Sequence, residues 1–277
     1  IQSEISNNVG TGGAGIFNAG KGMLIESSTI SGNTTNGASS GGGLYLQQTT
    51  TIRNSTISGN DSGSASAILF LNSGQVLTLE NCTITGNTNR NATVAGYAIE
   101  FGLNPVFNYS NTIIANNTYR DSTSQTIEGH DCSSTGATIG TNLNNLVEDG
   151  TCSAALSGDP KLAPLADNGG FTKTHALLTG SIALRAANAT TFLSTDQRGV
   201  TRPQPAGTVS DIGAFESRLT TMSAVKSYPE LSATDTKPTV TLKLTRSLNG
   251  VIDTTFAPMD VLLDGTVDAP CPSLEGC

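Results

Sequence analysis

The stretch Ser28-Thr29-Ile30-Ser31-Gly32-Asn33 decides the fold, because close copies of it return at nearly constant spacing. The copies occupy residues 4–8, 55–60, 82–87 and, more loosely, 111–116. Their central isoleucines are Ile5, Ile30, Ile57, Ile84 and Ile113, so the spacings are 25, 27, 27 and 29 residues. A repeat of this length is typical of a solenoid or a related array.

Two further apolar runs accompany each copy. One precedes it, as at residues 23–25 and 77–79, and one follows a cluster of small residues, as at 43–46. Short runs rich in Ile, Thr and Leu, bounded by Gly, Asn and Ser, are typical of strands separated by turns. We therefore expect three short strands in every turn.

Stacking of successive turns would bury the apolar face that a single turn leaves exposed. Each strand then lies about 4.8 Å from its equivalent, and like residues meet like. The sequence predicts Ile over Ile in the core and Asn over Asn at a bend, where the Asn side chains hydrogen-bond along the ladder. We expect Asn to adopt the left-handed conformation at that bend, and Gly32, Gly59 and Gly86 to relieve it.

The expected fold is all-β, a right-handed parallel β-helix (β-solenoid) over residues 1–217, since parallel crossovers are nearly always right-handed. Residues 1–118 hold the repeated turns, and 119–217 hold a long loop and the closing turns. Residues 218–277 contain alternating runs and an Asn249-Gly250 hairpin signal. They predict a small β-sandwich-like module with too few strands for a complete immunoglobulin-like fold.

The composition disfavours two classes of interaction, with nucleic acid and with the interior of a membrane. Only 13% of the residues are charged and the net charge is −8, so nucleic acid is not expected to bind. No apolar run approaches the roughly 18 residues of a membrane span. The first residues do not resemble the polar cap of a solenoid end, so we expect a piece of a longer protein or a processed form.

The five cysteines indicate an oxidising compartment. Cys132 and Cys152 bracket one loop, and Cys271 and Cys277 lie close together, so we expect two disulfides. Cys82 occupies a repeat position otherwise held by Ser, which predicts a buried, unpaired thiol. No Cys or His cluster has zinc spacing, and neither a metal nor a cofactor is expected.

Residues 159–216 contain four ordered motifs. They are Asp159-Pro160-Lys161-Leu162, Asn168-Gly169-Gly170-Phe171-Thr172-Lys173-Thr174-His175-Ala176-Leu177, Thr195-Asp196-Gln197-Arg198-Gly199 and Asp211-Ile212-Gly213-Ala214-Phe215-Glu216. With the turns before them, they resemble the bacterial secreted β-helix proteins known as choice-of-anchor Q domain proteins, over about residues 1–217. The resemblance implies a right-handed parallel β-helix exported to the cell surface or beyond, and it implies no known reaction.

The charged residues of this block are expected to form a network that closes the last rung of the solenoid. They are Asp196, Arg198, Arg202, Asp211 and Glu216. Arginine forks pair well with carboxylates, so we favour this structural role over a catalytic one. His175 in the same block is expected to be a hydrogen-bonded structural residue.

Glu26, Arg53 and Glu80 occupy equivalent points on three successive turns and form the alternative, glycan-facing site. A glycosidase needs two carboxylates that flank one bond. A Glu-Arg-Glu row is more typical of stacked charge complementarity, and we assign no catalytic residue.

The sequence favours a non-enzymatic, exported bacterial structural protein or adhesin, serving as a stalk or as a fibre subunit that assembles head to tail. The expected partners are further copies of the chain, other cell-surface components and glycans. The alternative is a polysaccharide lyase or hydrolase, or a glycan-binding β-helix, although the absence of Trp disfavours a binding module.

Overall fold

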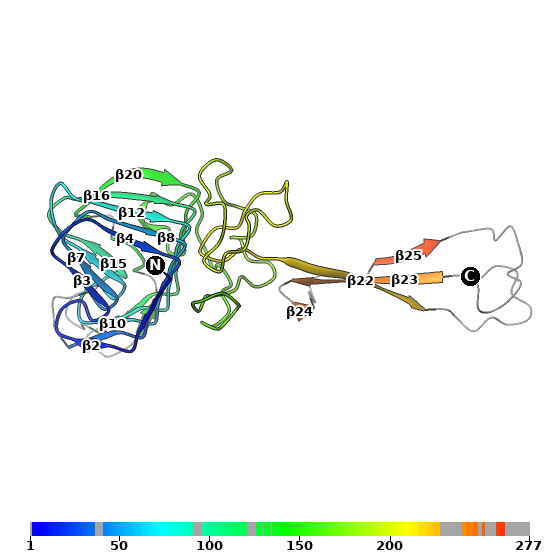
Figure 1. The fold of residues 1–277 in the computed structure, drawn as a ribbon, viewed down its shortest axis with the longest axis horizontal. Coiled ribbons are helices and arrows are strands. Elements are labelled where there is room, and N and C mark those ends of the chain that lie inside the picture. The colour runs from blue at the N-terminus through cyan, green and yellow to red at the C-terminus, as the bar shows by residue number, and fades with distance from the viewer. Residues whose placement is uncertain are drawn as a thin grey trace, which may run out of the picture. The chain divides into compact units, whose positions relative to one another are not determined.

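The computed structural model describes residues 2–36, 41–90, 96–120, 126–128, 130–133, 135–227, 240–248, 251–252 and 259–263. The chain divides into two compact units, Ile1–Arg218 and Leu219–Cys277, which are described separately. The first unit is a parallel β-solenoid (Figure 1), as the repeat predicted.

Four short strands make up each of the first four turns, and the strands stack into four parallel sheets. Sheet A contains β1 (Glu4–Ser6), β5 (Thr29–Ser31), β9 (Thr56–Ser58), β13 (Thr83–Thr85), β17 (Ile113–Ala115) and β21 (Leu146–Val147). Sheet B contains β2 (Val9–Gly10), β6 (Thr34–Thr35), β10 (Asp61–Ser62), β14 (Thr88–Asn89), β18 (Thr118–Arg120) and the antiparallel β19 (Thr126–Glu128). Sheet C contains β3 (Ile16–Asn18), β7 (Leu44–Leu46), β11 (Ile68–Phe70) and β15 (Ile99–Phe101). Sheet D contains β4 (Met23–Glu26), β8 (Thr50–Arg53), β12 (Val76–Glu80), β16 (Val106–Ser110) and β20 (Thr138–Leu143).

The expectation of three strands per turn was therefore wrong by one. The strands of sheet B that the repeat contributes, β6, β10 and β14, have only two residues each, and all six of these residues are polar. A strand this short carries no apolar alternation for a periodicity to detect.

Isoleucines stack in the core of sheet A. Ile30, Ile57 and Ile84 are register partners and are fully buried. The next partner of Ile84 is Ile114, so the last spacing is 30 residues and the alignment on Ile113 was wrong. The sequence did not show this one-residue shift, because Ile113 and Ile114 are adjacent. Ile113 points out of the solenoid and belongs to a second apolar cluster.

An asparagine ladder runs along one corner of the core. Each side-chain amide donates from Nδ2 to the Oδ1 of the next Asn at 2.9 Å, and that Oδ1 also accepts from the backbone N–H of the preceding rung at 3.0 Å. The ladder consists of Asn8, Asn33, Asn60, Asn87 and Asn117. The predicted Asn stacking is therefore confirmed.

The left-handed residue of this bend is the one before each ladder Asn, which corrects the expectation. Gly32, Gly59 and Gly86 adopt φ of 64–67°, as predicted, and Asn7 and Asn116 replace glycine on the outer turns. The ladder Asn itself keeps a negative φ, because its side chain must point into the core. Asn does take the left-handed conformation at the bend between sheets D and A, as at position 54.

Residues 159–217, here called the strap, do not form closing turns of the solenoid. They contain isolated β-bridges but no strand, and they lie beside the solenoid (Figure 1), where they contact the outer face of sheet A. The Gly213 N–H donates to the carbonyl of Asn111, whereas the Thr172 hydroxyl bonds the carbonyl of Ser27, so the strap reaches both late and early turns. The small Ser and Thr side chains on this face let an irregular backbone approach closely.

The described part of the second unit is one antiparallel sheet. It contains β22 (Leu219–Ser227), β23 (Val240–Leu248), β24 (Val251–Ile252) and β25 (Met259–Leu263). β23 and β24 pair as the predicted hairpin requires, although Asn249 and Gly250 lie outside the described residues. The second layer that a sandwich needs is not among the described strands.

Candidate functional site

Glu26, Arg53 and Glu80 lie in register on the outer face of sheet D. The Arg53 Nε lies 3.7 Å from a Glu26 oxygen and 3.8 Å from a Glu80 oxygen, and all three side chains are partly exposed. The guanidinium thus lies between the two carboxylates, where a glycosidase would hold the bond to be cleaved. The geometry fits stacked charge complementarity, and such exposed pairs contribute about 0–1 kcal/mol each.

Arg202, Glu216 and Asp211 form a buried cluster within the strap. The Arg202 guanidinium donates to Glu216 Oε2 at 2.8 Å and to the carbonyl of Gly213 at 2.6 Å, and neither charged side chain is exposed. Loss of hydration raises the pKa of Glu216 and of Asp211 and lowers that of Arg202. The carboxylate oxygens of Glu216 and Asp211 also accept backbone N–H groups, including those of Gln204 and Ser217. Within the described residues, the buried Arg202 Nε has no hydrogen-bond partner.

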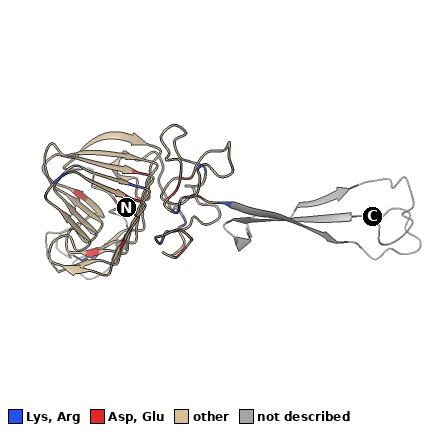
Figure 2. Ribbon diagram, in the orientation of Figure 1, with Lys and Arg blue, Asp and Glu red and all other residues tan. Residues whose placement is uncertain are grey.

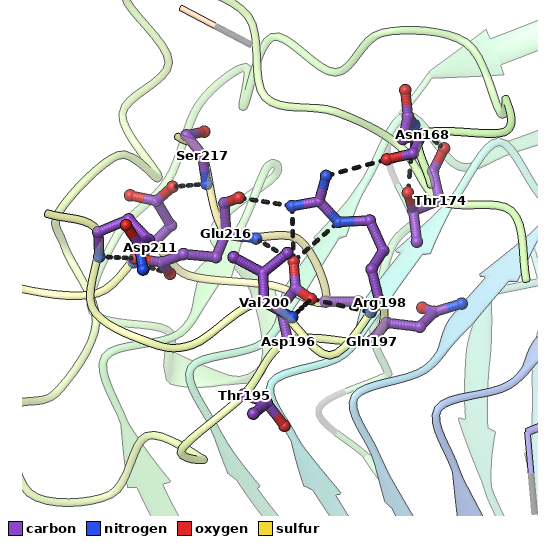
Figure 3. Close-up of polar contacts among 12 residues, drawn as sticks. Asn168, Thr174, Thr195, Asp196, Gln197, Arg198, Val200, Asp211, Glu216 and Ser217 are labelled. Atoms are coloured by element: carbon purple, nitrogen blue, oxygen red, sulfur yellow. Dashed lines mark hydrogen bonds and ion pairs between the residues drawn. The ribbon is translucent and has the colours of Figure 1, made fainter. Parts of the chain in front are cut away.

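Asp196 and Arg198 form the second half of this network (Figure 3). Arg198 donates from Nε at 2.9 Å and from Nη2 at 2.7 Å to Asp196 Oδ2, and its guanidinium lies 3.6 Å above the Phe215 ring. The same Nη2 donates to the backbone carbonyl of Glu216, which joins the two halves. The strap therefore gathers charged residues that are sparse along the solenoid (Figure 2).

All five predicted network residues lie together, but they do not lock a last rung. Their partners are strap residues, so the network gives the strap its own shape. Stable attachment to the solenoid comes from other residues, which the sequence analysis missed.

Gln197 joins the strap to sheet A through hydrogen bonds. Its buried amide accepts at Oε1 from the Thr56 hydroxyl at 2.6 Å and donates from Nε2 to the hydroxyls of Thr29 and Thr172 at 2.8 and 2.9 Å. Thr29 and Thr56 are register partners on adjacent strands and are fully buried. Thr recurs at the same outward-facing position of successive turns, and this pattern could have indicated a segment that covers sheet A. Without such a segment, these hydroxyls would be exposed to water.

A groove of about 530 Å³ lies where the strap meets sheet A and the bend that follows it. The solenoid contributes Thr85 and Asn116 to its lining, and the strap contributes Asp159, Lys161 and His175. Burial lowers the pKa of His175, which favours the neutral imidazole. His175 is hydrogen-bonded through both ring nitrogens, as the structural interpretation expected.

The Cys132–Cys152 disulfide is present, and both cysteines belong to the apolar core. Cys152 lies in a short 3-10 helix, Thr151–Ser153, and its carbonyl accepts from the buried Tyr109 hydroxyl at 2.5 Å. The bridged loop thereby covers the late end of the solenoid core. Cys271 and Cys277 lie outside the described residues.

Cys82 is buried and unpaired, as predicted, and burial raises the pKa of its thiol to about 12. A thiol with that pKa is not a nucleophile near neutral pH. Among the described residues, no group of three or more His, Cys, Asp or Glu is placed to hold a metal ion. The described part of the chain also contains no helix long and apolar enough to span a bilayer.

Asp131 ends the asparagine ladder, which the sequence analysis did not foresee. Its Oδ1 accepts from the Asn117 amide at 2.8 Å. Asp131 and Asp149 also exchange bonds, each backbone N–H donating to the other's carboxylate at 3.0 and 3.3 Å. Burial raises the pKa of Asp131 to about 7, with a smaller contribution from the Asp149 charge.

Comparison with known proteins gives one match. A family model described as a right handed beta helix region covers residues 1–162, which is more than half of the chain. No curated protein matches the chain, and no solved structure matches it.

Proposed function

The chain belongs to the right-handed β-helix family, and from that premise we propose that it is an exported structural protein of a bacterial surface or extracellular fibre. In this role the solenoid is a stiff spacer, as part of a stalk, an adhesin or a fibre. Repeat proteins suit this role because each turn is stabilised by its neighbours, so rigidity extends along the stack.

The observation that carries the proposal is the unbroken asparagine ladder inside four continuous sheets. Every rung from Asn8 to Asn117 uses the same pair of side-chain and backbone hydrogen bonds. A ladder of this kind resists bending and shear between turns, because each turn is tied to the next by backbone and side-chain bonds.

Assembly of copies end to end is part of the proposal. Among the described strands, β1 to β4 each pair with one neighbour, and the proposal is that strands of a second copy pair along their other edges. Strand addition of this kind is a common mode of protein association. At the other end, the terminal strands of sheets D and A, β20 and β21, lie within the segment closed by the Cys132–Cys152 disulfide, so the contact there would involve that segment.

Action on polysaccharides remains the competing function. It would use the face that carries Glu26, Arg53 and Glu80. The two ion pairs to Arg53 favour a structural role for these residues, because neither carboxylate is left without a cationic neighbour.

Electron microscopy and mass photometry of the purified chain test the proposal. We expect elongated particles that associate along the solenoid axis at micromolar concentration. A Met23→Lys variant places a charge at the inner face of the open edge and should abolish association. The control Phe17→Lys changes a side face that is 54% exposed and should leave association intact. Monomers at all concentrations, or cleavage of a polysaccharide panel by the wild-type chain, would contradict the proposal.

A further inference from the structure

One buried hydroxyl in the groove between the strap and sheet A has no hydrogen-bond partner. Thr85 is the last residue of β13, and it faces out of sheet A because the preceding Ile84 faces the core. Thr85 lines the groove and is only 3% exposed, and its hydroxyl makes no hydrogen bond within the described residues. The equivalent hydroxyl one turn earlier, on Ser58, is bonded to His175. Because an unpartnered buried hydroxyl costs free energy, the Thr85 hydroxyl indicates a partner that enters the groove from outside.

Asn116 adds an amide to the same groove. It follows β17 directly, and its backbone N–H donates to Glu148 at 2.6 Å. Its exposed side-chain amide has no partner in the part of the chain that the structure describes. A side-chain amide offers two donors and one acceptor, which match the carbonyl and the N–H of a peptide bond.

Asp159 and Lys161 give the groove one charge of each sign. Both side chains are exposed, and neither forms an ion pair with another described residue. Asp159 Oδ1 accepts the backbone N–H of Lys161 at 2.7 Å. His175, the other titratable group of the lining, is kept neutral because burial lowers its pKa. Two unpaired charges of opposite sign complement a zwitterion, whereas a neutral sugar would neutralise neither of them.

The size and the apolar part of the groove also fit a small ligand. Its volume of about 530 Å³ lies within the range of roughly 300–1,000 Å³ that is typical of small-molecule sites. Leu178 and Pro164 belong to its lining, and Leu178 is 47% exposed. A ligand side chain that packs on this leucine would remove apolar surface from water.

We propose that the groove binds a short peptide that has free termini and an apolar side chain. The Asp159 carboxylate binds the N-terminal ammonium of the peptide, and the Lys161 ammonium binds its C-terminal carboxylate. The Asn116 amide and the Thr85 hydroxyl bond the peptide group between the termini, and the apolar side chain packs on Leu178. This binding site goes beyond the structural function and does not depend on the assembly of copies.

Titration of the wild-type chain with the dipeptide leucyl-leucine, followed by ligand-observed NMR, tests the proposal. We expect a dissociation constant of about 0.1–1 mM, the usual range for a ligand of this size. Blocking both termini, in N-acetyl-leucyl-leucinamide, should weaken binding about 5- to 20-fold, because one exposed ion pair contributes about two- to fivefold. No binding at ten times the expected dissociation constant, equal binding of the doubly blocked peptide, or equal binding of glucose would overturn the proposal.

Two variants assign the two charges. Asp159→Asn keeps the oxygen that accepts the Lys161 N–H, and it should weaken binding of leucyl-leucinamide about two- to fivefold without affecting N-acetyl-leucyl-leucine. Lys161→Met should weaken binding of N-acetyl-leucyl-leucine by a similar factor without affecting leucyl-leucinamide.

Asp167→Asn is the matched control for the first variant. Asp167 Oδ1 accepts the backbone N–H of Gly169 at 3.0 Å, in the same two-residue arrangement, but Asp167 is not part of the groove lining. Binding of all the peptides should be unchanged in this control. Equal losses in Asp159→Asn and Asp167→Asn, or no loss in Asp159→Asn, would contradict the proposal. The blocked peptides test the wild-type chain, so they decide the matter even where a variant fails to fold.

Discussion

Removal of one rung from the asparagine ladder should cost far more in the middle of the solenoid than at its first turn. Asn60 is fully buried and its side chain makes four hydrogen bonds, two with Asn33 and one each with Asn87 and the carbonyl of Ile30. Asn8 is exposed, and its amide donates one bond to Asn33. Both residues have the same chemistry and differ in the number of bonds.

The expected magnitudes follow from that difference. A hydrogen bond contributes about 1 kcal/mol net, and an unsatisfied buried donor adds a cost of about 1–3 kcal/mol. Asn60→Ala loses four bonds and leaves the backbone N–H of Asn33 without its side-chain acceptor, so the free energy of unfolding should fall by about 5–7 kcal/mol. Asn8→Ala should lower it by about 1 kcal/mol or less.

Equilibrium urea unfolding, followed by circular dichroism, measures both values on matched samples. Asn87→Ala should behave like Asn60→Ala, because Asn87 has the same kind of partners one turn later. Hydrogen exchange should show faster opening at the backbone N–H of Asn33 in Asn60→Ala. Equal losses for Asn60→Ala and Asn8→Ala, or a loss below 1 kcal/mol at Asn60, would refute the idea that the ladder holds the turns together.

Three other perturbations have defined outcomes. The pKa of Asp131 is about 7 in the folded protein and 3.8 ordinarily, so the folded protein binds more protons than the unfolded chain between about pH 4 and 7. Its free energy of unfolding should therefore fall by up to about 4 kcal/mol as the pH rises through this range. Asp131→Asn should remove this pH dependence in equilibrium unfolding, and an unchanged dependence would contradict the prediction. Replacing Cys132 and Cys152 together by Ser should lower the free energy of unfolding by about 2–4 kcal/mol in chemical denaturation, and no loss would show that the disulfide does not stabilise the fold. Arg202→Ala should cost about 3–5 kcal/mol because it leaves a buried carboxylate unpaired, whereas Arg53→Ala on the partly exposed face should cost less than about 1 kcal/mol by the same measurement.

The solenoid could be predicted from sequence because its information is local and repeated. Equivalent residues such as Ile30 and Ile57 have the same neighbours in every turn, so one turn predicts the contacts of the next. The asparagine ladder could be predicted for the same reason. The prediction failed where the local signal was ambiguous, at the adjacent pair Ile113 and Ile114, and where a strand was too short to show a period.

The groups with potential chemistry were much harder to predict. The residues of the buried network were identified by charge and type, yet their place in the strap was not. Contacts such as Thr56 to Gln197 and Ser58 to His175 join residues more than a hundred positions apart, and no repeat relates the two partners.

The sequence by itself determined the β-helix, the stacking of like residues, the buried thiol of Cys82 and the pairing of Cys132 with Cys152. These depend on periodicity and on loop closure, which are properties of the chain. Tertiary structure alone decided that the strap lies along sheet A instead of extending the stack, and that Asp131 ends the ladder. The physical reason is that an outward hydroxyl such as that of Thr56 can be satisfied equally well by water or by Gln197, and only the folded strap selects between them.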